Sequence, residues 1–340
     1  MKKVLSIILK YVVPVIIGVG LIYILYNGVD LEAAKSTLVN DVNYWWFVPV
    51  ICVSIMSHVF RALRWRLQLR AIDVKTPLHP IVNSIFGTYA VNLVFPRLGE
   101  VWRCGYIAQR EKASFTQVVG SMVADRLSDT VTVLALTVCT FFLAQDAFYS
   151  FLDTYPQVKE GLVGMVTSWK MWAVAVVGLV ALVWLFTSKT ENKLVLKVKD
   201  MVKGLWDGFA AILHMEGKWW FLLYTVCIWG CYFFQLYIAA QAFTYTCDLS
   251  MLAILVLFVL SSIGMGIPTN GGLGAWHMAI IFGLSLYGVG TFSATHPDTQ
   301  ASAFAMLVWG IQTLLLIVLG IYAYVCIMLE KKKTTQDTAK

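Results

Sequence analysis

Long apolar runs, separated by short polar segments, form the dominant pattern along the 340-residue chain. A run of about 20 apolar residues is long enough to cross the hydrocarbon core of a bilayer as a helix. We predict six such spans, at residues 8–26, 44–63, 128–145, 170–187, 219–243 and 300–328. The pattern therefore predicts an all-α polytopic membrane protein.

Two further apolar stretches, residues 78–95 and 250–290, each come with a helix breaker. The first runs into Pro96-Arg-Leu-Gly99, and the second contains Pro268-Thr-Asn-Gly271. Proline removes a backbone donor and glycine permits a positive φ, so both residues interrupt helices. We therefore expect two helical hairpins, each bent at a Pro-x-x-Gly turn.

The distribution of charge sets the expected orientation. Charged residues make up only 13% of the chain, about half of the ~25% usual in soluble proteins. Lysine and arginine gather at residues 61–75, 189–203 and 330–340, and the positive-inside bias makes these segments cytoplasmic. Both termini then lie inside the cell. The first broken stretch enters and leaves on the cytoplasmic side, and the second does so on the outer side.

These constraints predict a single transmembrane domain, residues 1–340, that contains two inverted repeats. The first repeat covers residues 44–145 and the second covers residues 219–328, with a cytoplasmic amphipathic helix at 190–217 and a cytoplasmic tail at 330–340. Both broken stretches would be re-entrant hairpins whose turns approach each other near the bilayer midplane. The alternative is two pairs of complete spans with loops at the breakers.

The stretch FPRLGEVWR places Arg97, Glu100 and Arg103 at three-residue spacing. Residues three apart are neighbours on a helix, so a helix that starts after Pro96 would present all three on one face. The surplus positive charge suits an anion such as a phosphate, which arginine binds through a planar fork. The alternative is an interfacial loop whose arginines contact lipid headgroups.

The stretch ADRLSD is a second polar cluster, inside a continuous helical pattern at residues 115–145. Asp125 and Asp129 lie one helical turn apart, and Arg126 can pair with Asp129. Ionisable groups within a spanning helix are costly and usually functional. We expect a carboxylate of this cluster to lie within salt-bridge distance of Arg97 or Arg103, unless the helix protrudes into the cytoplasm and exposes the cluster to water.

A glycine-rich turn, PTNGGLGAWH, forms the third candidate element. Its backbone can approach a ligand closely, and the helix that follows directs partial positive charge toward an anion. Helix packing is the alternative reading for the turn and for its histidine. The candidate residues are Asn270, Gly271, Gly272, Gly274 and His277. By contrast, we interpret the arginines of FRALRWRLQLR, residues 60–70, as anchors that contact anionic lipid.

In order and spacing, these motifs resemble the transmembrane domain of the lysylphosphatidylglycerol synthase/flippase family. The matching elements are RALRW after the second span, NLVFPRLGEVWR, DRLSD and PTNGGLG, and the resemblance covers nearly the whole chain. It implies an all-helical, lipid translocase-like domain. The chain departs from the family at Trp276 and His277, where an acidic residue is frequent. The resemblance assigns function to Arg97, Glu100, Arg103, Arg126, Asp129, Gly271, Gly272 and Gly274.

We therefore predict a flippase-like protein of the cytoplasmic (inner) membrane that moves a phospholipid or a lipid-linked phosphate between leaflets. The alternatives are a membrane-embedded lipid-modifying transferase and an accessory subunit for a partner lipid or sugar transferase. The chain ends shortly after its last span, so we expect no aminoacyl transfer from it alone. The expected partners are lipids with anionic headgroups, a separate lipid-modifying enzyme and further copies of the chain. We expect no nucleic acid, cofactor or metal, since the seven scattered cysteines form no CxxC pair.

Overall fold

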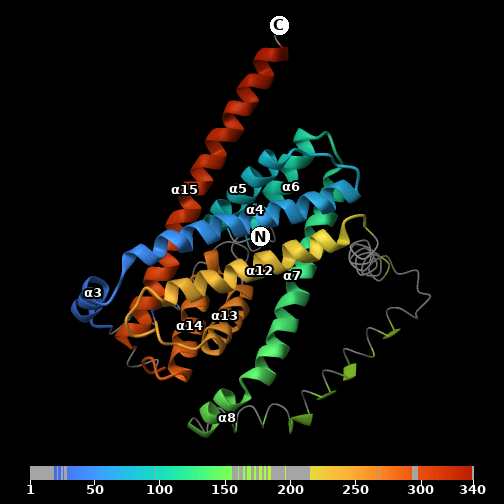
Figure 1. Ribbon diagram of the computed structural model, residues 1–340. Helices are drawn as coiled ribbons and strands as arrows, with labels where there is room; N and C mark the ends of the chain where they lie inside the picture. The colour runs from blue at the N-terminus through green and yellow to red at the C-terminus, as the bar shows by residue number, and fades with distance from the viewer. Residues whose placement is uncertain are drawn as a thin grey trace, which may run out of the picture.

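The computed structural model describes residues 29–95, 97–154, 215–267, 269–292 and 298–338, with isolated positions at 19–26 and 160–196. Within this part of the chain the regular elements are all helices (Figure 1). The predicted spans at 8–26 and 170–187 and the predicted amphipathic helix at 190–217 lie outside the described residues, apart from isolated positions and a turn at 215–217.

Among the described residues, four helices are long and apolar enough to cross a membrane. They coincide with four of the predicted spans and confirm an integral membrane protein. The first begins with a short 3-10 turn, η2 (Tyr44–Trp46), and the last continues through most of the predicted tail. Their bounds are α4 (Phe47–Ala71), α7 (Phe115–Leu143), α12 (Lys218–Ala240) and α15 (Thr299–Thr338).

The two broken stretches form helix pairs, and both breaks fall at the predicted turns. The first pair is α5 (Leu78–Val94) and α6 (Leu98–Arg110). The second pair is α13 (Met251–Gly266) and α14 (Ala275–Leu286), joined through a 3-10 turn, η3 (Asn270–Gly272). Pro96 and Pro268 themselves lie outside the described residues.

In each pair, a glycine of one helix lies against the backbone at the start of, or within, the other helix. A Cβ on Gly99 of α6 would lie 2.1 Å from the backbone oxygen of Thr88 on α5. In the second pair, a Cβ on Gly264 would lie 2.9 Å from the backbone oxygen of Ala275. Because real Cβ atoms do not approach backbone oxygens this closely, a side chain at either position would push the paired helices apart.

The long helices hold the two hairpins together. α4 runs antiparallel along α12 (Figure 1), with Phe47 near Phe243 at one end and Arg64 near Phe221 at the other. α5 packs against α15, and α13 packs against α7. Each hairpin thus contacts the last long helix of the other half of the chain.

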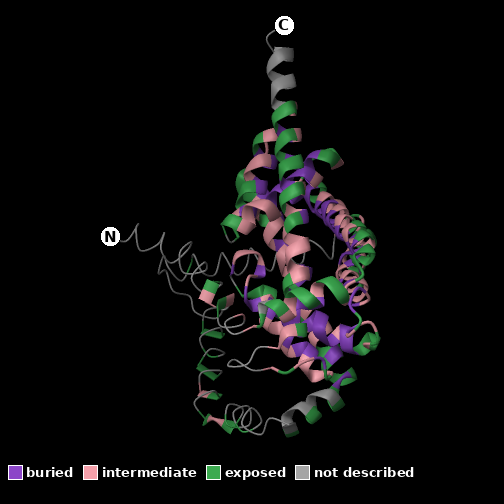
Figure 2. Cartoon of the chain, turned by 90° about the vertical axis from the view of Figure 1, so that its left-hand side faces the viewer, coloured by how far each residue is buried: buried purple, intermediate pink, exposed green. Residues whose placement is uncertain are grey.

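Two shorter helices, α3 (Leu31–Asn40) and α8 (Gln145–Thr154), lie beside the long ones. Asp30 caps α3 by accepting hydrogen bonds from the N–H groups of Glu32 and Ala33. Figure 2 shows buried residues gathered in the body of the molecule. In Figure 1 the C-terminal part of α15 projects beyond the other helices. The body has two main apolar clusters, one around Phe243 and Phe304 and the other around Trp65.

Candidate functional site

The tips of the two hairpins touch. The side-chain amide of Asn270 donates hydrogen bonds to the carbonyl oxygens of Leu93 and Val94, at 3.3 and 2.9 Å. In the opposite direction, Nη2 of Arg97 donates to the carbonyl oxygen of Gly266 at 3.0 Å. The predicted approach of the two turns is thus confirmed for residues next to the two prolines.

A buried ion cluster lies where α4, α6 and α7 pack together. Arg64 contacts both aspartates of α7, with Nη2 at 2.7 Å from Asp125 Oδ1 and 2.7 Å from Asp129 Oδ1. Arg61 donates to Asp129 Oδ2 at 2.7 Å and lies 3.6 Å from Asp125 Oδ2. We define the buried ion cluster as Arg61, Arg64, Arg103, Asp125 and Asp129, each at most 9% exposed.

Arg103 is the least satisfied member of this cluster. Its Nη2 lies 3.5 Å from Asp125 Oδ2, and its guanidinium carbon lies 4.4 Å from the ring centre of Trp65. This contact confirms the predicted salt bridge between FPRLGEVWR and DRLSD. Nε and Nη1 of Arg103 have no hydrogen-bond partner among the described residues. Three arginines facing two aspartates leave one surplus positive charge out of water.

A second ion pair adjoins the cluster at its more exposed edge. Arg126 Nη2 lies 2.6 Å from Glu100 Oε1, and Arg126 Nη1 lies 3.6 Å from Asp129 Oδ2. The side chain of Asn92 joins the two helices of the hairpin, because its amide donates to Glu100 Oε2 and its oxygen accepts from the N–H of Gly99. Glu100 therefore pairs with Arg126 and not with the arginines three residues to either side.

Helix α12 completes the surroundings of the cluster. The hydroxyl of Tyr232 accepts a hydrogen bond from Arg61 at 3.2 Å, and the hydroxyl of Thr225 accepts one from Arg64 at 3.3 Å. These two residues are seven apart, which places them on one face of α12, two turns from each other. The cluster consequently joins one helix of the second half of the chain to three helices of the first.

The sequence-based interpretation of Arg61 and Arg64 as lipid anchors is wrong. Both side chains are buried and paired with the aspartates of α7. One signal in the sequence could have identified this pairing. Arg61 and Arg64 are three residues apart and Asp125 and Asp129 are four apart, and either spacing is about one helical turn. The two arginines can therefore share one helix face and meet the two aspartates on the face of another helix. Arg70, at the end of α4, is exposed, as an anchor should be.

The expected common face of Arg97, Glu100 and Arg103 is also wrong for one member. Arg97 precedes the first residue of α6 and has a φ of 62°, in the left-handed region. This conformation is uncommon for a residue with a side chain. It turns the guanidinium of Arg97 to the second hairpin, whereas Glu100 and Arg103 face α7.

The glycine-rich turn keeps its predicted conformational role. Gly271, Gly272 and Gly274 have φ values of 58°, 77° and 79°, which glycine adopts at little cost. The carbonyl oxygen of Gly271 accepts a hydrogen bond from Trp309 Nε1 of α15 at 2.9 Å. The turn therefore contacts α15 on one side and the first hairpin on the other.

His277 lies apart from the arginines. It is 1% exposed, and its ring lies between 5.2 and 5.9 Å from the rings of Tyr26, Trp276 and Trp309. No described contact joins it to the buried ion cluster. This aromatic environment fits the packing role that the sequence left open.

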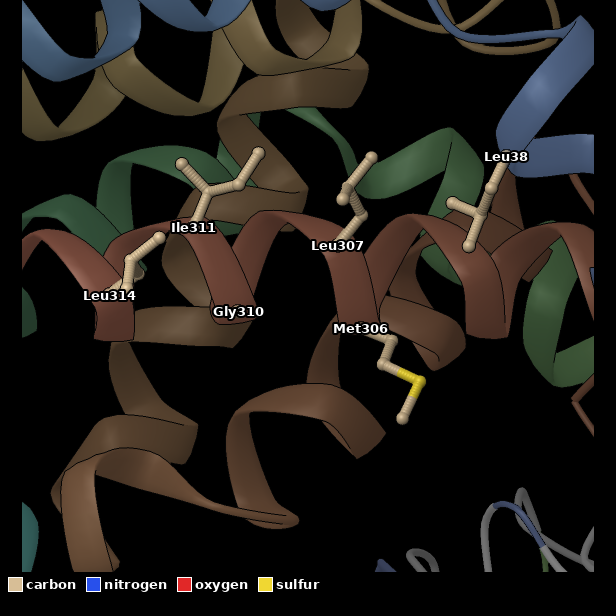
Figure 3. Close-up of a pocket in the computed structure, with 6 residues that line it drawn as sticks. All are labelled: Leu38, Met306, Leu307, Gly310, Ile311 and Leu314. Carbon is tan, nitrogen blue, oxygen red and sulfur yellow. The ribbon is translucent and has the colours of Figure 1, made fainter. Parts of the chain in front are cut away.

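An apolar pocket lies between α3 and α15 (Figure 3). Its walls carry no charged side chain, so it suits hydrocarbon and is not a candidate for polar chemistry. It is lined by Leu38, Met306, Leu307, Gly310, Ile311 and Leu314.

Comparison with known proteins yields one family. Searches of curated proteins and of solved structures each returned no match. Residues 11–320 match the family model described as the lysylphosphatidylglycerol synthase TM region, which covers most of the chain and all the charged groups described above. The family and the apolar helices together indicate an integral membrane protein of lipid metabolism. The chain therefore belongs to the family of lysylphosphatidylglycerol synthase transmembrane regions.

Proposed function

We propose that this protein is a lipid translocase that moves the headgroup of a phospholipid or of a lipid-linked phosphate between leaflets. The observation that carries the proposal is the buried ion cluster, which keeps one surplus positive charge inside a membrane protein of a lipid-related family. A charge inside the bilayer is costly unless it has a partner. An anionic headgroup passing the cluster would supply that partner for part of its path.

Helix length supports re-entrant hairpins. α6 has 13 residues and α14 has 12. At 1.5 Å per residue they extend about 20 and 18 Å, whereas a hydrocarbon core is about 30 Å thick. Helices of this length fit better as half-crossings that meet inside the membrane than as complete spans.

The packing pattern supports two inverted repeats. Most contacts within α4–α7 have a counterpart within α12–α15: the first long helix packs on the next helix, the hairpin helices pack on each other, and the second hairpin helix packs on the last long helix. The exception is the contact of α4 with α7, which carries the buried ion cluster and has no comparable contact between α12 and α15. The contact of α5 with α15 likewise corresponds to that of α13 with α7. This is the arrangement of transporters whose substrate site lies where the repeats meet.

The contacts within the cluster also suggest which helix would move during the proposed transport. Arg103 reaches the aspartates from α6, the second helix of the first hairpin, through a single contact at 3.5 Å. Arg61 and Arg64 make shorter contacts from α4. Separation of α6 from α7 would thus release Arg103 first, so that its guanidinium could take a headgroup phosphate in place of Asp125.

An embedded transferase is less well supported, because the available carboxylates are already engaged. Both oxygens of Asp129 contact arginines, and both oxygens of Glu100 accept hydrogen bonds from Arg126 and Asn92. A general base must be able to take a proton from the substrate. Carboxylates held by two or more cationic or amide donors are poorly suited to that task.

Leaflet exchange in sealed liposomes tests the proposal. Purified protein is reconstituted with trace fluorescent phosphatidylglycerol, and dithionite added outside reduces only the probe in the outer leaflet. We expect protein-dependent loss of the inner-leaflet signal, with lipid masses unchanged by mass spectrometry. Arg103→Gln, in the cluster, should slow the exchange. Arg70→Gln, at an exposed arginine outside the cluster, should not. A chemically altered lipid would favour the transferase. Absence of protein-dependent leaflet exchange would contradict transport.

A further inference from the structure

Arg97 differs from every other arginine near the hairpin tips. The arginines of the buried ion cluster lie out of solvent and face aspartates, and Arg126 pairs with Glu100. Arg97 is exposed, and no carboxylate in the described part of the chain lies within salt-bridge distance of it. Glu100, three residues further on, is engaged elsewhere. At the tip of the first hairpin, Arg97 is thus a cation without a counter-ion among the described residues.

The surroundings of Arg97 are apolar and exposed. Val94 and Phe95, just before it in the chain, are 61% and 45% exposed. Met265 and Ile267, on either side of the glycine whose carbonyl it contacts, are 51% and 46% exposed. Arg97 is therefore flanked by exposed apolar side chains from both hairpin tips, and such side chains suit contact with acyl chains.

Hydrogen bonds to the described part of the chain leave most of the Arg97 guanidinium unused. An arginine has five N–H donors, and one bond joins Arg97 Nη2 to the carbonyl oxygen of Gly266. The left-handed backbone at φ 62° is uncommon for a residue with a side chain. On the facing turn, Thr269 is 6% exposed and its hydroxyl has no described hydrogen-bond partner. Among the described residues, the tip thus offers donors without acceptors at Arg97 and Thr269, beside one acceptor without a donor, Asn270 Oδ1.

We propose that Arg97 binds the phosphodiester of an anionic phospholipid, with the acyl chains lying over Val94, Phe95 and Ile267. An unpaired guanidinium among lipid-facing side chains is costly, and a phosphate supplies both the charge and the oxygens that match its planar donors. The inference rests on the proposed function and refines it: Arg97 holds the headgroup at the hairpin tip, and the buried ion cluster lies further along its path.

Lipid binding tests this directly, because it is measured without transport. Native mass spectrometry of the purified protein in a neutral detergent is used to titrate dioleoyl phosphatidylglycerol. Arg97→Gln should raise the dissociation constant about 10-fold or more, since hydrogen bonds to charged groups are among the stronger ones. The dissociation constant of Arg97→Lys should lie between those of the unmodified protein and Arg97→Gln, because lysine keeps the charge without the planar fork. Lys35→Gln, which removes an exposed cation on α3, far from the hairpin tips and from the basic segment at residues 61–75, is the control.

The outcomes separate this inference from the proposed function. Equal binding by Arg97→Gln and Lys35→Gln would overturn the Arg97 site, whatever the transport assay shows. Displacement of the lipid by inorganic phosphate at similar concentration would overturn the lipid as the occupant. Arg97-dependent binding in a protein that gives no leaflet exchange would keep the site and overturn the translocase. Size-exclusion profiles identical to that of the unmodified protein show that the variants are folded.

Discussion

Removing the charge of Asp125 is the most informative single change in the buried ion cluster. The carboxylate lies 2.7 Å from Arg64 Nη2, 3.5 Å from Arg103 Nη2 and 3.6 Å from Arg61 Nη1, and its side chain is fully buried. Asp125→Asn keeps the shape of the side chain and removes the negative charge. Three arginines would then face Asp129 alone, and the surplus positive charge would rise from one to two.

The expected cost is large compared with ordinary protein stability. Two unit charges about 4 Å apart interact with about 4 kcal/mol at an effective dielectric constant of 20. Removal of one partner from a buried ion pair typically costs about 3–5 kcal/mol. We therefore expect Asp125→Asn to lower the free energy of unfolding by roughly 3–5 kcal/mol, out of the ~5–15 kcal/mol typical of a folded domain.

Unfolding in mixed micelles, followed by tryptophan fluorescence, measures this cost. Asp146→Asn makes the same chemical change at an exposed site on α8 and should alter stability by less than about 0.5 kcal/mol. Adding Arg103→Gln to Asp125→Asn returns the surplus charge to one, so the double variant should recover part of the loss. If Asp125→Asn and Asp146→Asn had equal effects, the electrostatic reasoning would be refuted.

Two further predictions concern the hairpins. Asn270→Ala removes the two hydrogen bonds to the backbone of α5 and should lower the free energy of unfolding by roughly 1–3 kcal/mol. Asn40→Ala, on the exposed end of α3, should have little effect in the same unfolding assay. Gly99→Ala places a Cβ 2.1 Å from the oxygen of Thr88 and should cost about 1–3 kcal/mol through overpacking. Gly120→Ala, with open space around the new Cβ, should be neutral or stabilising, and equal behaviour of the two alanine variants would contradict the close hairpin packing.

The spans and the hairpin breaks could be predicted because they depend on local sequence. Runs of apolar residues define α4, α7, α12 and α15 through length and composition alone, and proline with glycine ends α5 and α13 through backbone chemistry. The salt bridge between Arg103 and Asp125 also followed from local rules, because a short connection between two helices fixes their antiparallel register. These features need no knowledge of distant contacts.

The remaining parts of the site depend on packing between distant segments. Arginines at the end of a span satisfy the positive-inside rule, so the sequence alone favours an anchoring role for Arg61 and Arg64. The packing of α7 against α4 pairs them with aspartates instead. The support from Tyr232 and Thr225 comes from a helix more than 150 residues away in the chain. Helical spacing places Arg97 on the face of Glu100 and Arg103, whereas its left-handed backbone precedes the helix and turns it to the second hairpin. Helical spacing could not show that.

The meeting of the two hairpin tips inside the bilayer is tested most directly by the depth of spin labels at Val94 and Ile267. Both residues are exposed, at 61% and 46%, one on each tip. Labels attached to single cysteines there, in a variant without the seven native cysteines, are compared with a label at Lys75, an exposed residue before the first hairpin. We predict that both tip labels collide more often with oxygen than with a water-soluble nickel chelate, and that they lie at similar depth near the bilayer centre. The Lys75 label should collide more often with the nickel chelate than with oxygen. A tip label at headgroup depth would contradict the re-entrant arrangement and, with it, the proposed path for the lipid headgroup.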